Sequence, residues 1–210
     1  MSEKIRINKY IASTGQVSRR GADELIKQGK VTVNGKVVIE PGFQVSDKDK
    51  VLVDGKKIQP EAKKYYAFYK PAGYITTKTD PKGRKTIYDI LPEEMRKLNT
   101  AGRLDRASTG LIILTNDGEL IQKLTHPKIH VSKVYRVVVE GKITEQDIDT
   151  LANGIEIEEG KIAYAEAVIL GYEKKETVLQ VTLYQGYNRQ IRRMMDFIGH
   201  PVVSLKRIAH

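Results

Sequence analysis

The sequence predicts an α+β fold, with a small N-terminal module followed by a larger unit built on a mainly antiparallel mixed sheet with flanking helices. Two observations indicate this fold class. Most of the chain consists of short apolar segments that end at turn signals, and only a few segments have the 3.6-residue period of an amphipathic helix. Hairpin turns join several of the strand segments, which argues against a doubly wound parallel sheet. A chain of 210 residues, 40% of them hydrophobic, is long enough for two domains.

Residues 1–60 have the pattern of a compact module. Two short helices are predicted from apolar residues at i, i+3 and i+4 spacing, namely Ile7, Tyr10 and Ile11, then Ala22, Leu25 and Ile26. Gly15 and Gly29 are suitable helix stops, and Ser18 can cap the second helix. The period then changes to two in "VTVNGKVV", where Asn-Gly at 34–35 is a strong hairpin signal, and Asp-Gly at 54–55 is a second one.

Residues 61–64 are polar, follow a proline and are predicted to be a linker to a domain over residues 65–210. In that domain the strand-like segments are "YYAFYKPAGYITT", "LIILTNDG", "KVYRVVVEG", "AYAEAVILGYE" and "TVLQVTLYQG". Helices are expected near residues 117–125, 144–152 and 188–198. The two domains together account for the whole chain.

Composition limits the classes of function. The net charge of +10 favours a polyanionic partner, and residues 1–60 are the more densely basic part, with 12 Lys+Arg against 7 Asp+Glu. There is no cysteine and there are only four histidines, so neither a disulfide framework nor a zinc centre is expected. No apolar run approaches the roughly 20 residues of a membrane span, and the start lacks a secretory signal. We therefore expect a cytoplasmic protein without a metal and without a membrane partner.

The basic residues of the N-terminal module could neutralise phosphates, although a solvated face kept for solubility has about even odds on composition alone. The candidates for RNA binding are Arg6, Lys9, Arg19, Arg20 and Lys30. The stretch "RINKYIASTGQVSRRGADELIKQGKVTVNGKVV" resembles the S4 (αL-like) RNA-binding domain, with paired arginines opening its second helix. At Gly21 such domains often have glutamate, so the capping-box partner of Ser18 is missing here.

Two further segments could carry chemistry. In "NRQIRRMMDFIGH" the apolar residues have helical spacing, and Arg192 falls at the edge of the apolar stripe, from which a long side chain can reach into a cleft. In "GRLDRASTG" an aspartate lies among arginines, which would keep it ionised. Taken alone, an ordinary surface helix and a structural ion pair are the commoner explanations.

The order of "YKPAG", "GRLDRASTGLIILTNDGEL", "SKVYRV" and "LYQGYNRQIRRMMDFIGHPVVSLKR" resembles the RsuA/RluB/RluE/RluF branch of pseudouridine synthases, with the RluF type as the nearest. The resemblance covers nearly the whole chain. It implies that Asp105 is the catalytic residue, that Tyr135 stacks on the flipped base, that Arg192 pairs with the aspartate and that Arg103 faces the RNA. Asn188 and Arg189 would be phosphate contacts.

The resemblance also implies the reaction, in which uracil is detached from its ribose, rotated and rejoined through C5 without a cofactor. Attack of the aspartate on the sugar, attack on the base and a glycal route all stay open. In Lys70-Pro71 the preceding Tyr69 replaces the family's usual asparagine, and we expect a structural role for this segment.

These observations predict a site-specific RNA pseudouridine synthase that acts as a monomer, with 23S rRNA as the expected substrate and 16S rRNA or a tRNA as alternatives. A non-catalytic S4 protein that assists ribosome assembly or senses ribosomes is the alternative from another class. A metal-dependent nuclease lacks the clustered carboxylates that divalent ions need.

Overall fold

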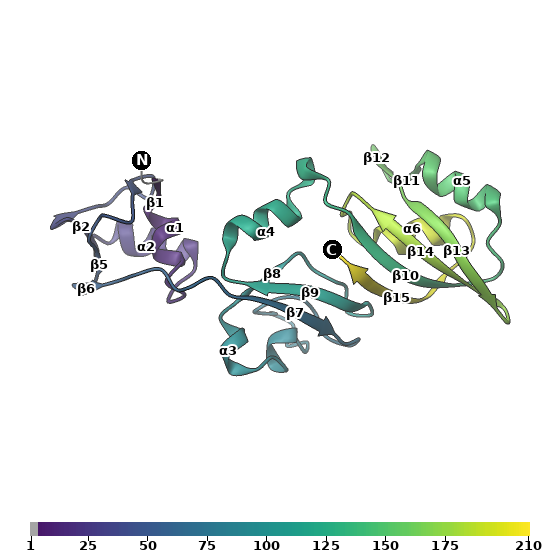
Figure 1. Cartoon of the computed structure of the whole chain (residues 1–210), viewed down its shortest axis with the longest axis horizontal. Helices are drawn as coiled ribbons and strands as arrows, with labels where there is room; N and C mark the ends of the chain where they lie inside the picture. Colours follow the sequence, from purple (N-terminus) through teal and green to yellow (C-terminus); the bar gives the residue numbers. More distant parts are fainter. Residues whose placement is uncertain (1–3) are drawn as a thin grey trace. The chain divides into compact units, whose positions relative to one another are not determined.

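The computed structural model describes residues 4–210, which divide into two compact units, the first ending at Lys64 and the second spanning Tyr65–His210 (Figure 1). The first unit consists of β1 (Ile5–Arg6), α1 (Ile7–Ala12), α2 (Arg19–Lys27), β2 (Val31–Val33), β3 (Lys36–Val37), β4 (Gln44–Val45), β5 (Val51–Val53) and β6 (Lys56–Lys57). β1 pairs with β4, and the other strands form an antiparallel sheet of order β3-β2-β5-β6. Glu61, in the segment predicted as linker, still donates its N–H to the carbonyl of Ser13.

The local signals of the first unit are confirmed. Both helices bury their predicted apolar residues in one core with the strands, although Leu25 is only partly buried. The Ser18 hydroxyl accepts a hydrogen bond from the Gly21 N–H at 3.1 Å, and glycine at that position leaves the capping box incomplete. Both hairpin turns have positive φ at their two central residues, as type I′ turns require. The first helix ends at Ala12, earlier than the predicted stop at Gly15.

The second unit is built on a seven-stranded sheet with the order β13-β14-β10-β15-β9-β7, and β8 also pairs with β9. The strands are β7 (Tyr65–Lys70), β8 (Asn99–Ala101), β9 (Thr109–Thr115), β10 (Lys133–Glu140), β13 (Glu166–Glu173), β14 (Glu176–Leu183) and β15 (Val202–Ala209). All pairs are antiparallel except β15 with β9, so the predicted mainly antiparallel mixed sheet is confirmed.

Helices and short strands complete this unit. They are η1 (Ile87–Asp89), α3 (Glu93–Arg96), α4 (Gly118–Thr125), η2 (Pro127–Ile129), α5 (Glu145–Asn153), β11 (Ile155–Glu158), β12 (Lys161–Ala163) and α6 (Gln190–Phe197). The three predicted helices correspond to α4, α5 and α6. The sequence did not predict β15, which is the strand that joins the two halves of the sheet.

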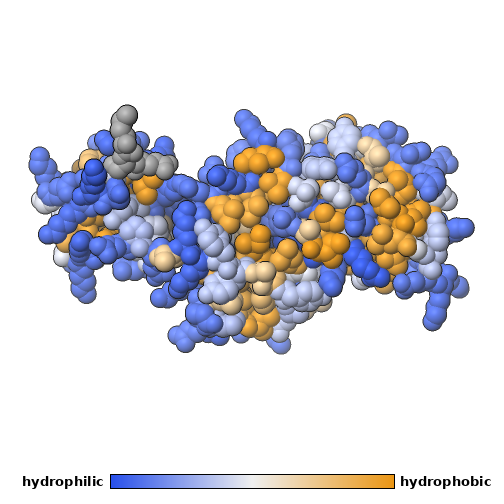
Figure 2. All heavy atoms as spheres, viewed as in Figure 1, coloured by the Kyte–Doolittle hydropathy of each residue, from blue (hydrophilic) through white to orange (hydrophobic). Residues whose placement is uncertain are grey.

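Two hydrophobic cores lie in the second unit. The larger joins β10, β14 and β15 with α6, and includes Val137, Leu179 and Met194. The smaller packs η1 and the segment before β8 against β7 and β9. Outside these cores, exposed apolar side chains alternate along β13, and hydrophobic residues gather there in Figure 2. In the part of the chain that the structure describes, no helix is long and apolar enough to span a membrane.

The parallel junction between β15 and β9 depends on Gly110. Its backbone has φ +106°, and a Cβ built at this position would lie 2.2 Å from the carbonyl oxygen of Arg207. Gly110 is paired with Arg207 on one side and with Lys70 of β7 on the other. A residue without a side chain is therefore required where three strands meet, directly after the loop that carries Asp105.

Candidate active site

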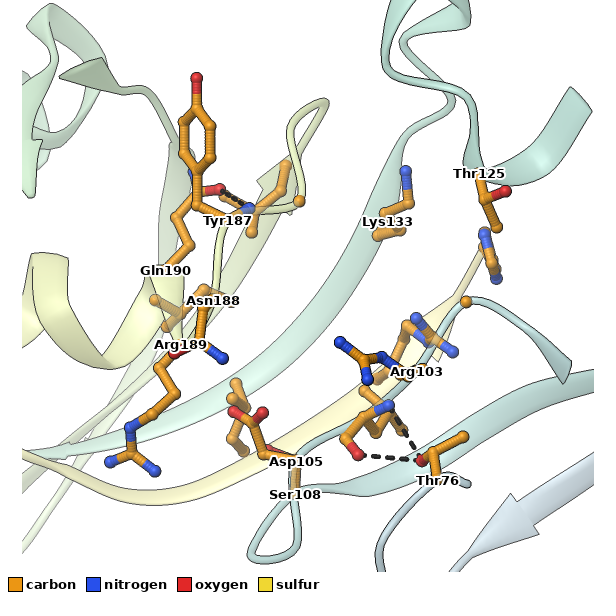
Figure 3. A pocket seen from close by; sticks show the side chains of 18 of the residues that line it. Thr76, Arg103, Asp105, Ser108, Thr125, Lys133, Tyr187, Asn188, Arg189 and Gln190 are labelled. Carbon is orange, nitrogen blue, oxygen red and sulfur yellow. Dashed lines mark hydrogen bonds between the residues drawn. The ribbon is translucent and has the colours of Figure 1, made fainter. Parts of the chain in front are cut away.

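A cleft of about 1000 Å³ opens in the second unit, where β9, β10 and β15 meet the segment that precedes α6. Asp105, Tyr135, Arg103, Asn188 and Arg189 all line it, so five of the residues predicted for the active site are brought together from distant parts of the chain. Figure 3 shows Asp105 at the base of the cleft, with Arg103 on one side and Asn188 and Arg189 on the other.

The loop that carries Asp105 is fixed by two buried side chains. The Lys70 ammonium, which is fully buried, donates to the carbonyl oxygens of Ser108 at 2.7 Å, Pro71 at 3.0 Å and Arg106 at 3.4 Å. The Thr76 hydroxyl donates to the Leu104 carbonyl at 2.9 Å and accepts from its N–H at 3.2 Å (Figure 3). Both ends of the loop are thereby held, and the position of Asp105 is determined by backbone contacts on either side.

Burial and charge oppose each other at Lys70. Burial lowers the pKa of Lys70 to about 8, and the carboxylate of Asp105 acts in the opposite direction. This supports the structural role that the sequence analysis expected for the segment.

Asp105 has an open carboxylate. It is half-buried, and in residues 4–210 no cationic side chain lies within the 4.0 Å of an ion pair with it. The only other carboxylate side chain of the cleft lining, Asp80, is bound to Arg84 at 2.7 Å, and this contact lowers the pKa of Asp80 to about 2. Of the two, Asp105 is the carboxylate whose oxygens are available to a ligand.

Tyr135 lies on β10, and its side chain belongs both to the cleft lining and to the larger core. It is 9% exposed. Burial raises the pKa of Tyr135, Arg207 lowers it through charge and hydrogen bonding, and Asp105 raises it. Tyr135 is therefore both a residue of the core and a residue of the cleft.

Arg192 does not make the direct contact with Asp105 that the resemblance implied. Its Nη1 donates to the carbonyl oxygen of Val202 at 3.2 Å, while Nε is buried without a hydrogen-bond partner. Burial and the charge of Arg189 lower the pKa of Arg192, whereas Asp105 and Asp196 raise it. Arg192 therefore influences the aspartate electrostatically across a distance longer than an ion pair. Its half-buried position agrees with the predicted edge of the apolar stripe.

The segment before α6 is ordered by glutamine side chains. Gln190 accepts from the Tyr187 N–H at 3.2 Å and donates to the Tyr164 carbonyl at 3.2 Å. Arg189, which is exposed, occupies the N-cap position with the left-handed φ of +51° and makes no side-chain capping hydrogen bond, so α6 begins at Gln190 and not at the predicted residue 188. A non-glycine residue in this conformation is strained and is typical of functional loops.

Among the RNA-binding candidates of the first unit, Arg6, Arg19, Arg20 and Lys30 are exposed and Lys9 is half-buried. Arg6 precedes α1, and the two adjacent arginines open α2. A hydrogen bond of 2.8 Å from Asn8 to Asp23 ties the two helices together. Arg6, Arg19 and Arg20 therefore lie at a fixed pair of helix starts, whereas Lys9 lies in the last turn of α1 and Lys30 lies between α2 and β2.

Three residues that no role was predicted for also shape the site, namely the buried side chains of Thr76, Gln190 and Arg207. Arg207 was within a quoted motif, but no local pattern indicated that it would be buried. No group of three or more metal-ligating side chains is found in residues 4–210.

Comparison with known families defines the class of protein. A family model described as RNA pseudouridylate synthase matches residues 64–197, and a model of the S4 domain matches residues 5–51. The chain belongs to the RNA pseudouridylate synthase family and carries an S4 RNA-binding domain. It is therefore an isomerase that converts uridine to pseudouridine in RNA.

Individual relatives refine this assignment. The chain is 45% identical over 204 residues to ribosomal large subunit pseudouridine synthase B of Bacillus subtilis, covering 96% of this chain and 84% of the relative. It is 35% identical over 216 residues to the enzyme of that name from Vibrio cholerae, covering 100% of this chain and 67% of the relative. These relatives confirm the RsuA/RluB group, and they carry the name of the B enzyme, whereas the sequence analysis pointed to the RluF type.

Solved structures agree with the fold. A crystal structure of a pseudouridylate synthase superposes with a TM-score of 0.66 at 30% identity, covering 97% of this chain and 87% of that one. An H/ACA RNP bound to a substrate RNA containing 2′-deoxyuridine gives a TM-score of 0.51 at 18% identity and covers 68% of this chain and 46% of that one, a likeness of fold alone.

Proposed function

We propose that this enzyme converts a specific uridine of 23S rRNA to pseudouridine and that Asp105 is its catalytic carboxylate. The observation that carries the proposal is the open carboxylate of Asp105 in a cleft that also holds Tyr135. The choice of RNA is supported by the names of the relatives from Bacillus subtilis and Vibrio cholerae, which are enzymes of the large ribosomal subunit.

The reaction needs a carboxylate that is ionised and close to the ribose. The C1′–N1 bond breaks with its electron pair going to uracil, a C1′–C5 bond forms, and in the balance one proton leaves C5 and one is gained at N1. Asp105 assists the departure of the base, by attack or by removing a proton from the sugar. Since Lys70 and Thr76 fix the loop on both sides, the carboxylate meets the nucleoside in one position.

The other cleft residues have supporting roles in this proposal. The ring of Tyr135 stacks on the extruded base, and Arg103, which is exposed in the cleft, occupies the gap that the base leaves in the RNA. Arg192 adds positive potential near Asp105, and Asn188 and Arg189 contact phosphates. Extruding a base costs a few kcal/mol, which binding of the RNA backbone must offset.

Most of that binding energy is assigned to cations. Besides the buried Arg207, five Lys and Arg side chains line the cleft against two Asp side chains. In the first unit we assign phosphate contacts to Arg6, Lys9, Arg19, Arg20 and Lys30. The cleft selects the nucleotide, while the S4 domain adds affinity that depends on RNA shape and salt.

The decisive experiment is a single substitution. Asp105→Asn should bind 23S rRNA like the unaltered enzyme and form no pseudouridine, measured as carbodiimide adducts that stop primer extension. Asp149→Asn, an exposed aspartate on α5, is the control and should keep full activity. Substantial conversion by folded Asp105→Asn would refute the role of this residue.

The same assay separates the other classes of function. If the unaltered protein binds rRNA and converts no uridine in 23S rRNA, 16S rRNA or tRNA, it is a non-catalytic S4 factor. Conversion of 16S rRNA or tRNA alone would change the substrate but not the reaction. Loss of activity in EDTA would point to a metal-dependent enzyme.

The assembly state and location follow from the same proposal. For the assembly state we propose a monomer, the default expectation from the sequence. Sedimentation at micromolar concentration should give the mass of one chain, 23.7 kDa. An enzyme that acts on rRNA would work in the cytoplasm, and fractionation of cells should recover it with ribosomal particles.

A further inference from the structure

Arg207 is a buried cation at the floor of the cleft. It lies on β15, is 3% exposed and lines the cleft with Asp105 and Tyr135. Its Nε donates to the carbonyl oxygen of Leu111 on β9 at 2.7 Å. The guanidinium is thereby fixed to the strand that follows the Asp105 loop.

The charge of Arg207 is not neutralised within the protein. In the described part of the chain no carboxylate lies within 4.0 Å of it, and Nη2 is buried without a hydrogen-bond partner. Burying an unpaired guanidinium costs several kcal/mol, so a protein retains one where it does something. The strand junction with Gly110 holds this group beside the reacting residues.

Tyr135 is the direct neighbour of Arg207. The two residues are opposite each other in the β10–β15 register, and the ladder shifts by one residue next to Tyr135. Residues directly opposite in an antiparallel pair bring their side chains together on one face of the sheet. Both side chains reach the cleft from that face.

We infer that Arg207 is a positioning residue that acts through Tyr135, its fixed guanidinium holding the Tyr135 hydroxyl in place for proton transfer to and from the base. The inference rests on the proposed function of the cleft. A phenol that takes a proton from C5 and gives one to N1 ends each turnover in its starting state. Whenever it has given up its proton it carries negative charge, which a buried guanidinium stabilises.

Several charged groups act in this part of the cleft. Asp105, from the loop before β9, and burial raise the pKa of Tyr135, whereas Arg207 lowers it. Lys133 on β10 and His210 after β15 lie close enough to Arg207 for its charge to lower their pKa values. Arg189 lines the cleft before α6, and Arg192 on α6 lies close enough to Asp105 for the aspartate to raise its pKa. Without Arg207, burial and Asp105 would still raise the pKa of Tyr135, so we expect that pKa to be higher than in the unaltered enzyme.

The test is a double-mutant cycle in single-turnover kinetics, with 23S rRNA tritiated at uracil C5 and release of tritium as the readout. Arg207→Gln should lower the rate by roughly 10²-fold, the scale of one acid–base group, while RNA affinity stays the same. In the Tyr135→Phe background, Arg207→Gln should lower the rate less than threefold, because the effect of Arg207 passes through the hydroxyl that phenylalanine lacks. Arg207→Lys should recover part of the rate.

The pH profile supplies a second readout. The inflection that Tyr135→Phe abolishes should lie at higher pH in Arg207→Gln. Arg136→Gln, an exposed arginine next to Tyr135 on β10, is the control and should change neither quantity. If Arg207→Gln does not fold, the cycle is run with Arg207→Lys.

Additive losses in the cycle, or an inflection that does not move, would overturn the inference. An unaltered enzyme that releases no tritium would instead contradict the proposed function. Full activity in Arg207→Gln would remove the role of Arg207 and leave the proposed function intact.

Discussion

Gly110→Ala should separate β15 from β9 and so disturb the site from below. The added Cβ would meet the carbonyl oxygen, nitrogen and carbonyl carbon of Arg207 at 2.2, 2.7 and 2.9 Å. These are backbone atoms, so no rotamer change relieves the overlap. Alanine at φ +106° adds backbone strain of about 1–3 kcal/mol. Parting the strands adds the loss of hydrogen bonds at about 1 kcal/mol each.

The expected total is at least about 3 kcal/mol of local stability, from these two contributions. Because two units need not unfold in one transition, the assay is amide hydrogen exchange along β9 and β15, which reports opening free energies locally. Exchange in these strands should be at least about 100-fold faster, the equivalent of 3 kcal/mol. Pseudouridine formation should fall as well, since Arg207 and the Asp105 loop lie at this junction.

The control is Gly118→Ala. Gly118 opens α4, its φ lies outside the left-handed region, and no heavy atom would lie within 4 Å of an added Cβ. This variant should be as stable as the unaltered protein, or more stable by up to about 1 kcal/mol. If the amide exchange rates of β9 and β15 in Gly110→Ala were also within tenfold of those in the unaltered protein, the close approach of the two strands would not be the reason that glycine is required.

Two further perturbations test how the Asp105 loop is held. In the unfolded chain Lys70 has the ordinary lysine pKa of 10.5, and in the folded protein its pKa is about 8. Between these values the unfolded chain binds more protons, so the unaltered protein should gain stability as pH rises from 8 to 10.5, by at most ~3 kcal/mol. The free energy of unfolding is measured by urea denaturation, followed by circular dichroism, across this pH range. In Lys70→Met the gain should disappear; if its free energy of unfolding depended on pH as in the unaltered protein, the lowered pKa of Lys70 would be contradicted. Thr76→Val removes both hydrogen bonds to Leu104 and should cost about 2–3 kcal/mol and lower the rate of pseudouridine formation. Thr79→Val, at an exposed position, should lower neither the stability nor the rate of pseudouridine formation.

The elements that the sequence predicted are those with local signals. The caps, hairpins and helix faces of the first unit are determined by neighbouring residues, and the structure reproduces them. Asp105 and Tyr135 were predicted as site residues because their segments have a characteristic local sequence. Their presence in one cleft depends on the strand order β10-β15-β9, which no local pattern contains.

β15 shows why the rest could not be predicted. Its buried positions are Leu205 and Arg207. Because one of the two inward-facing residues is an arginine, the sequence lacks the apolar alternation that predicts a strand. Its parallel pairing with β9 joins residues almost a hundred positions apart. A structural role was predicted for the Lys70 segment, but its contacts could not be, since the three carbonyl groups that Lys70 binds become neighbours only after the loop has folded.

Arg192 marks the limit of a helical-wheel argument. The wheel gave the direction of the side chain correctly, at the edge of the apolar stripe, but it does not give the length that the side chain must span. In the folded chain Arg192 Nη1 donates a hydrogen bond to the carbonyl of Val202, and Asp105 remains outside ion-pair distance. Direction follows from sequence position within one helix, whereas distance depends on how the helix packs.

The charges of the cleft are arranged for a ligand that is itself negative. Asp80 is matched by Arg84, Arg207 has no anionic partner within 4.0 Å in residues 4–210, and Arg192 is turned towards a carbonyl. In the proposed mechanism the oxygens of Asp105 meet the ribose; a close Arg192–Asp105 pair would cover them, whereas the open arrangement leaves the carboxylate accessible. A bound nucleotide brings phosphates for the exposed guanidiniums of the cleft, such as Arg103 and Arg189, and excludes water from Asp105, which strengthens both interactions at once. The energy of RNA binding is thereby linked to the chemistry, because the polyanion that binds the cations also increases the electrostatic effect of the charges around Asp105.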